Sequence, residues 1–192
     1  MQKLYLAPKP IYYYYKKDVI LRSLNTALQK QNSTMSKKTN ALRILEQNKI
    51  PYDIIEYTYD AENLNVAKIA EENGLALAQV YKTLVAKGDK TGIMVAVVAG
   101  DKSLSLKKMA AVSGNKKIAL VPVKDIQGLT GYIRGGCSPL GMKKQFPSYF
   151  DQSAKEFDKI YVNAGVRGVL FGCAAEDLVH IAAGQWADIA EE

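Results

Sequence analysis

The stretch Gly-Tyr-Ile-Arg-Gly-Gly-Cys-Ser-Pro-Leu-Gly, residues 131–141, carries four glycines in eleven residues. Glycine has no side chain to hold a ligand away, and it adopts positive φ without a steric penalty. Ser138 precedes Pro139, which favours an extended backbone and removes one N–H donor. Such a loop presents backbone donors beside a hydroxyl, which suits a carbonyl, an oxyanion or a phosphate. Composition alone also allows a tight connection between two strands.

The sequence around this loop predicts strands that come in hairpins. Residues 81–86 and 93–98 flank a glycine-containing turn, and residues 160–163 and 168–173 flank Ala164-Gly165. Further predictions are helices over 40–48 (capped by Thr39), 65–74, 105–112 and 175–183, strands over 52–57 and 117–121, and helical turns over 75–79 and 122–127. This order favours an α+β fold, with a mixed β-sheet surrounded by short helices, over a doubly wound parallel sheet.

Charge and composition divide the chain of 192 residues into two parts. Residues 1–36 hold six basic residues and one acidic residue, which gives +5 of the total net charge of +7. Residues 37–192 hold twenty basic and eighteen acidic residues, which gives +2. We expect one domain over 37–192, and a poorly ordered extension over 1–36 that is either genuine or upstream sequence included by a mistaken start codon. The high charge is therefore weak support for nucleic-acid binding by the main domain.

Several functional classes find no support in the sequence. No apolar run approaches the roughly 18 residues that cross a bilayer, so no membrane association is expected. Cys137 and Cys173, with the single histidine His180, make neither a disulfide framework nor a metal-ligand set. No Walker or dinucleotide motif is present, so we expect no cofactor and no metal. A reducing cytoplasm is the simplest compartment.

Lys82 is the most informative single residue. In a strand, Val80, Lys82 and Leu84 share one face, which places an ammonium among apolar neighbours. Such a lysine needs an anion or acceptors, unless it only reaches past a strand end to solvent. Tyr57 closes the strand over 52–57, where it donates into a pocket or simply fills the core. Three lysine pairs could contact phosphates or remain solvated: 107–108, 116–117 and 143–144.

These residues resemble a known family. Residues 80–84 (Val-Tyr-Lys-Thr-Leu), 131–141 and 161–168 (Tyr-Val-Asn-Ala-Gly-Val-Arg-Gly) are similar to three ordered motifs of the YbaK/EbsC aminoacyl-tRNA deacylases. That group is related to the editing domain inserted in bacterial prolyl-tRNA synthetases. The resemblance extends from about residue 38 to residue 190. It implies an α+β fold and the clearance of mischarged tRNA, most characteristically Cys-tRNA(Pro), with prolyl-tRNA synthetase as a partner.

The resemblance also implies roles for individual residues. Lys82 matches the essential lysine, and the remaining matches are Gly135, Gly136 and Ser138 at the aminoacyl ester and Tyr57, Tyr132, Asn163 and Gly165 around the substrate. Three positions depart from the family pattern. Leu170 stands where some relatives carry an acidic residue, and Asn163 where many have serine. Cys137 stands where many have an aliphatic residue, which favours a packing role over a nucleophilic one.

No conventional base–nucleophile pair is visible, so we expect positioning and oxyanion stabilisation to suffice for an already reactive aminoacyl ester. Either water or the thiol of a cysteinyl substrate would attack. The sequence also allows two alternatives: a deacylase of Ala-tRNA(Pro), and a non-catalytic module that binds tRNA or a synthetase.

Overall fold

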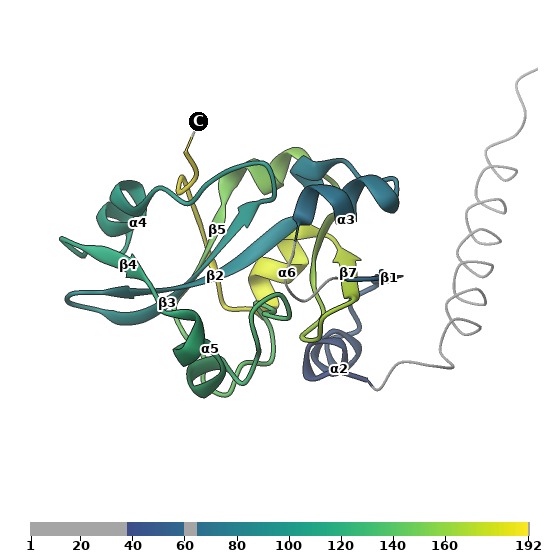
Figure 1. Cartoon of the computed structure of the whole chain (residues 1–192), viewed down its shortest axis with the longest axis horizontal. Helices are drawn as coiled ribbons and strands as arrows, with labels where there is room; N and C mark the ends of the chain where they lie inside the picture. The colour runs from purple at the N-terminus through teal and green to yellow at the C-terminus, as the bar shows by residue number, and fades with distance from the viewer. Residues whose placement is uncertain (1–37, 60–64, 192) are drawn as a thin grey trace, which may run out of the picture. The chain divides into compact units, whose positions relative to one another are not determined.

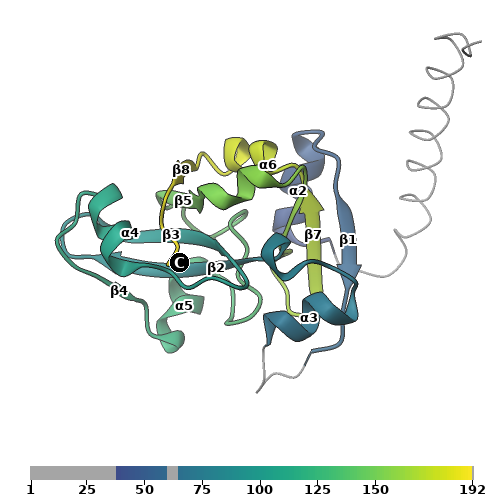
Figure 2. The same cartoon turned by 90° about the horizontal axis from the view of Figure 1, so that it is seen from above.

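The structure, a computed structural model, describes residues 38–59 and 65–191, whose strands form two sheets (Figures 1 and 2). The strands are β1 (Asp53–Glu56), β2 (Tyr81–Gly88), β3 (Gly92–Ala99), β4 (Ile118–Leu120), β5 (Ser148–Asp151), β6 (Ile160–Asn163), β7 (Val169–Cys173) and β8 (Gln185–Ala187). The helices are α2 (Asn40–Gln47), α3 (Val66–Glu72), α4 (Leu106–Val112), α5 (Val123–Thr130) and α6 (Ala175–Ile181), with 3-10 turns η1 (Leu77–Gln79) and η2 (Gln152–Glu156).

The larger sheet is mixed, in the order β4-β2-β3-β5-β8. β2 and β3 form a long antiparallel hairpin, and β5 and β8 add in parallel. The smaller sheet, β1-β7-β6, is antiparallel. A single parallel bridge between Val80 and Tyr161 joins the start of β2 to β6. The α+β fold with a mixed sheet, as the sequence predicts, is confirmed.

Helices cover both faces of the β2–β3 hairpin (Figure 1). On one face Met109 of α4 packs with Ala86, Met94 and Val98. On the other face Ile126 and Leu129 of α5 pack against a cluster that includes Val85 and Cys137. The largest cluster fills the space between the two sheets and α2, and Phe150, Phe171 and Leu45 are nearly inaccessible to solvent there. Burial of these side chains supplies the main driving force for folding.

Caps define the helix starts that the sequence predicts. Thr39 Oγ1 accepts a hydrogen bond from Leu42 N at 3.3 Å, and Asn65 Oδ1 accepts one from Ala67 N at 2.9 Å. Ser105 occupies the N-cap position of α4 but makes no side-chain capping bond. Gly74 and Gly114 follow α3 and α4 with φ of 65° and 71°, the left-handed conformation that ends helices.

Other elements differ from the prediction. α5 continues to Thr130, beyond the short turn expected over 122–127, and ends at Gly131 with φ of 84°. Strand β5 and turn η2 were not predicted. Strand β5 is buried at every position and therefore lacks the alternation that marks a half-exposed strand. The extension over 1–36 and most of the loop over 58–64 lie outside the described residues.

Candidate active site

A cavity of about 530 Å³ lies along the open edge of β2, between α3, α5 and the glycine loop, residues 131–141. β4 pairs with β2 only at residues 86–88, so the preceding part of β2 has no strand beside it on that side. The lining residues are Tyr57, Val66, Ile69, Val80, Tyr81, Lys82, Thr83, Leu84, Val85, Leu120, Val121, Val123, Ile126, Arg134, Gly135, Cys137, Asn163 and Leu170. The cavity therefore combines apolar walls with a few polar groups, as ligand sites do.

The backbone of β2 itself contributes polar groups to this cavity. The carbonyl of Val80 accepts a hydrogen bond from Gly100 N on the β3 side, and that of Val85 accepts one from Val121 N on the opposite side. Because hydrogen-bonding direction alternates along an antiparallel strand, Tyr81 and Thr83 direct their N–H and C=O groups to the open edge. A ligand at this edge meets backbone donors and acceptors that β3 does not use.

Lys82 is half-buried, and backbone carbonyls meet its ammonium. Nζ donates to the carbonyl of Lys102 and, at 3.4 Å, to that of Gly100, both in the loop after β3. Burial lowers the pKa of Lys82 from its usual value, and the charge of Asp101 offsets part of that shift. The lysine thus has the acceptors that its position requires, and one of its three N–H donors remains for a ligand.

The glycine loop is fastened to the turn between β6 and β7. Asn163 Nδ2 donates to the carbonyl of Gly135 at 2.9 Å, and Arg167 Nε donates to that of Arg134 at 2.8 Å. A Cβ atom added at Gly136 would lie 3.2 Å from Arg167 N, so glycine is what allows the two backbones to approach. These contacts fix the loop at the mouth of the cavity.

The backbone donors of the loop are used unequally. Gly136 N donates to the carbonyl of Ile133 at 2.9 Å. The backbone N–H groups of Arg134, Gly135 and Cys137 donate to no group among the described residues, and all three residues line the cavity. Unpaired backbone N–H groups of this kind can bind an oxyanion or a carbonyl.

Four residues predicted at the site do not line the cavity: Gly136, Ser138, Tyr132 and Gly165. Ser138 is fully buried, and its Oγ accepts a hydrogen bond from Leu140 N at 3.3 Å. Tyr132 is buried, donates to the carbonyl of Leu140 at 2.7 Å and packs on Gly165. Gly165 has φ of 94° and donates to Asn163 Oδ1 at 2.8 Å. Their contacts support the loop.

Tyr57, Asn163 and Leu170 form one wall. Burial raises the pKa of Tyr57, although a backbone hydrogen bond with Gly168 and the Asn163 amide both lower it, so its hydroxyl stays protonated at neutral pH. Leu170 pairs with Asn163 across β6 and β7. Leu170 contributes an apolar side chain to this wall, beside the polar groups of Tyr57 and Asn163.

Cys137 has the environment of a packing residue. It is buried, and burial raises the pKa of its thiol to about 12, so a thiolate does not form near neutral pH. His180 is exposed on α6 and does not line the cavity. The structure therefore brings no Cys–His pair together at this site.

Thr83 and Arg134 were not among the predicted site residues. Thr83 Oγ1 is buried without a hydrogen-bond partner among the described residues, and Thr83 lines the cavity. Arg134 is exposed at the rim of the cavity and makes no ion pair with any other described residue. The position of Thr83 next to Lys82 and that of Arg134 inside the glycine loop were the available signals.

None of the helices in the described part of the chain is both long and apolar enough to cross a membrane. No group of three or more His, Cys, Asp or Glu side chains in residues 38–59 and 65–191 is placed to hold a metal ion.

The sequence of this chain is similar to those of known proteins. Residues 61–181 match the model of the aminoacyl-tRNA editing domain. A protein of Enterococcus faecalis named "Putative Cys-tRNA(Pro)/Cys-tRNA(Cys) deacylase EbsC" is 46% identical over 152 residues, which cover 79% of this chain and 93% of that protein. The uncharacterised protein YwhH of Bacillus subtilis is 26% identical over 73% of this chain and 88% of its own length.

A solved structure shares the fold. It is described as "Crystal structure of a putative trans-editing enzyme for prolyl tRNA synthetase", and it superposes with a TM-score of 0.72 at 24% identity, over 83% of this chain and 100% of its own. The family match covers more than half of the chain and contains the cavity-lining strands and the glycine loop. The chain belongs to the aminoacyl-tRNA editing domain family.

Proposed function

We propose that this protein is a deacylase that acts in trans on mischarged tRNA, with Cys-tRNA(Pro) as its substrate. The observation that carries the proposal is the cavity, where a half-buried lysine and unused backbone N–H groups of the glycine loop line one largely apolar space. The 46% identity to the E. faecalis protein, whose name includes Cys-tRNA(Pro), supports the choice of substrate. Hydrolysis of an aminoacyl ester is the reaction that these groups fit best.

Lys82 would anchor the end of the tRNA. Its ammonium is held by the carbonyls of Gly100 and Lys102, so its remaining N–H has a restricted direction. A phosphate or a ribose hydroxyl is a suitable acceptor for that donor. Holding the tRNA end in one orientation lowers the entropy cost of the attack on the ester.

The N–H groups of Gly135 and Cys137 would bind the ester carbonyl. Negative charge develops on that oxygen as the nucleophile adds, and fixed donors stabilise it without reorganisation. Asn163 and Arg167 hold the loop rigid by binding the carbonyls of Gly135 and Arg134. The loop is thus organised before the substrate arrives.

The nucleophile would come with the substrate or the solvent, since Cys137 is buried and protonated. In one path, water adds to the carbonyl carbon while a terminal ribose hydroxyl aligns it, and the products are free amino acid and tRNA. In the other, the cysteinyl sulfur bonds to the carbonyl carbon, the ester C–O bond breaks and the ribose oxygen takes the thiol proton. That path releases a cyclic thiolactone, which would formally make the enzyme a lyase.

Selection among tRNAs would require a partner. The part of the chain from residue 37 onward carries only +2, and phosphate contacts hold no sequence information. We propose prolyl-tRNA synthetase, which would retain the mischarged tRNA while this domain acts on its 3′ end. Weak binding with a shallow salt dependence is expected for the isolated protein.

The test is deacylation of Cys-, Ala- and Pro-tRNA(Pro) and of Cys-tRNA(Cys), each with and without the synthetase, at two salt concentrations. Release of cysteine but not proline, with the synthetase favouring Cys-tRNA(Pro), supports the proposal. Preferential release of alanine would identify an Ala-tRNA(Pro) deacylase. No release with tRNA still bound would identify a binding module. An unchanged ratio between the two cysteinyl-tRNAs would exclude the synthetase as the source of specificity.

A further inference from the structure

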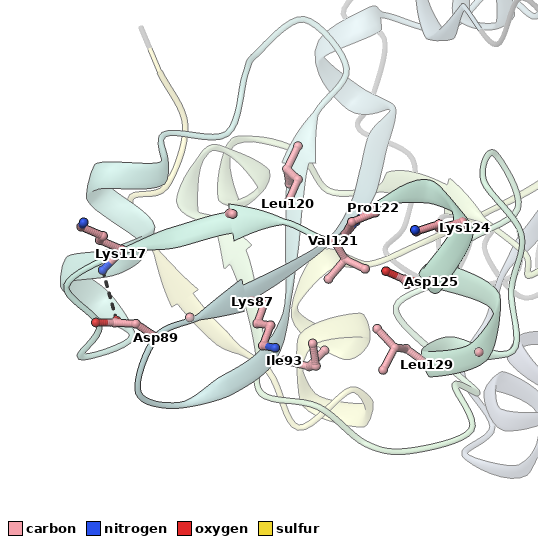
Figure 3. Close-up of a pocket in the computed structure, with 13 residues that line it drawn as sticks. Lys87, Asp89, Ile93, Lys117, Leu120, Val121, Pro122, Lys124, Asp125 and Leu129 are labelled. Carbon is pink, nitrogen blue, oxygen red and sulfur yellow. Dashed lines mark hydrogen bonds between the residues drawn. The ribbon is translucent and has the colours of Figure 1, made fainter.

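We propose that a second groove, beside the cavity, binds the single-stranded RNA that leads to the aminoacylated end. The inference rests on the proposed function, because it assigns a path to the same substrate. The groove, which we call the lysine groove, has a volume of about 860 Å³ and lies between the β2–β3 hairpin, β4 and α5 (Figure 3). It is lined by Lys87, Gly88, Asp89, Ile93, Lys117, Ala119, Leu120, Val121, Pro122, Lys124, Asp125, Gly128 and Leu129.

The lysine groove is continuous with the cavity. Leu120 and Val121 line both spaces. Lys87 and Ile93 are directly paired across β2 and β3, and they lie on the face that α5 covers, as Val85 does. A chain that leaves the cavity past Leu120 and Val121 therefore enters the lysine groove around the open edge of β2.

Three lysines are distributed along the groove. Figure 3 shows Lys117 at one end, Lys87 in the middle and Lys124 at the start of α5. All three are exposed, and none forms an ion pair within the described residues. Cations that are spread in a row fit successive phosphates of a strand better than they fit one small anion.

The two carboxylates of the groove do not cancel this pattern. Asp89 Oδ1 accepts hydrogen bonds from the backbone N–H of Lys116 at 2.9 Å and of Lys117 at 3.1 Å. The bond from Lys117 N contributes most to lowering the pKa of Asp89, and the bond from Lys116 N lowers it further. The carboxylate of Asp89 is therefore used to stabilise the turn. Asp125 lies in the first turn of α5, where the free N–H groups of the helix partly offset its charge.

Apolar side chains provide surfaces for bases between the lysines. Ile93 and Leu129, both half-buried, line the groove. At its junction with the cavity, Leu120 and Val123 are 51% and 56% exposed. Exposed apolar groups beside cations match a single strand, which offers base faces and phosphates alternately.

The experiment compares two variants of equal charge. The groove variant combines Lys87→Gln, Lys117→Gln and Lys124→Gln. The control variant combines Lys49→Gln, Lys107→Gln and Lys144→Gln, three other exposed lysines that line neither space. The probe is an uncharged, fluorescently labelled RNA of twelve nucleotides ending in CCA, and its affinity is measured from 50 to 200 mM salt.

Each phosphate contact contributes about 0.7 to the slope of log K (the RNA association constant) against log salt concentration. Loss of three contacts should therefore make the slope of the groove variant shallower by about 2. Over this fourfold range of salt, the affinity of the parent for RNA should therefore fall by roughly 15-fold more than the affinity of the groove variant does. The control variant should keep the slope of the parent. Both variants should hydrolyse a cysteinyl ester of adenosine at the parent's rate, because this substrate is too short to reach the groove.

Other outcomes would overturn the inference. Equal loss in both variants would mean that only net charge matters. Unchanged RNA binding by the groove variant, together with loss of rate stimulation by the synthetase, would assign the groove to a protein partner. Failure of the proposed function is separable: a parent that hydrolyses no ester would refute the deacylase, whereas the salt slopes are measured on uncharged RNA.

Discussion

Lys82 and Lys87 lie on the same strand, five residues apart, but in two different environments. Lys82 is half-buried at the cavity and donates to two backbone carbonyls. Lys87 is exposed in the lysine groove, on the opposite face of β2. The odd spacing places their side chains on opposite faces, since successive residues of a strand alternate. We expect the cavity around Lys82 to position the substrate and the lysine groove around Lys87 to attract it electrostatically. Substitutions in the two regions should therefore have different effects.

The largest difference should come from Lys82→Ala. We expect kcat/KM on Cys-tRNA(Pro) to fall by about 10²–10³, the usual cost of removing one positioned donor. The fold should survive, because the loss of a half-buried charge offsets part of the cost of leaving two carbonyls unpaired. The matched change Lys87→Ala should leave hydrolysis of the adenosine ester near normal. Near-normal turnover by a folded Lys82→Ala protein would contradict the role of Lys82.

The pH dependence should distinguish the same two lysines. The pKa of Lys82 is lowered by burial, so its positive charge is lost as pH rises through a value below the usual 10.5. Binding of a non-hydrolysable aminoacyl-adenosine analogue should then weaken, by up to about tenfold per pH unit above that pKa. In Lys82→Arg the guanidinium stays charged, so the alkaline loss should disappear. The same loss in both proteins would assign the titration to another group.

Two glycines should affect stability in opposite directions. Gly165 has φ of 94°, and a Cβ there would lie 2.8 Å from Tyr132 Cε1, behind the cavity. Gly165→Ala should lower the free energy of unfolding by roughly 1–3 kcal/mol. Gly128, in α5 beside the lysine groove, has no atom within 4 Å of an added Cβ. Gly128→Ala should raise it by about 0.5–1 kcal/mol. Urea unfolding of both variants measures this, and a Gly165→Ala protein as stable as the parent would contradict the need for glycine in the turn between β6 and β7.

Cys137→Ala should have the smallest effect on activity. The thiol is buried with its pKa raised to about 12, and it packs with Val85 and Tyr132. We expect kcat/KM to stay within about tenfold of the parent, with a modest loss of stability from the smaller side chain. A folded Cys137→Ala protein without activity would instead indicate a covalent thioester, and mass spectrometry of the quenched reaction would reveal it.

Local sequence determined most of the elements of this protein. Thr39 and Asn65 are caps because their side chains reach backbone N–H groups that lie next to them in the chain. The β2–β3 and β6–β7 hairpins follow from alternating residues around short turns. The motif around Lys82 and the glycine loop were recognisable for the same reason, since each is contiguous.

Tertiary structure alone decided which of these residues meet. β5 lies between β3 and β8 because sheet pairing joins distant segments, and its buried residues give no alternating signal. The bonds from Asn163 and Arg167 to the glycine loop span 28 and 33 residues, so no local pattern contains them. The same packing buries Ser138 and leaves the N–H groups of Gly135 and Cys137 without an acceptor among the described residues, because packing, and not sequence, determines which backbone donors already have a partner.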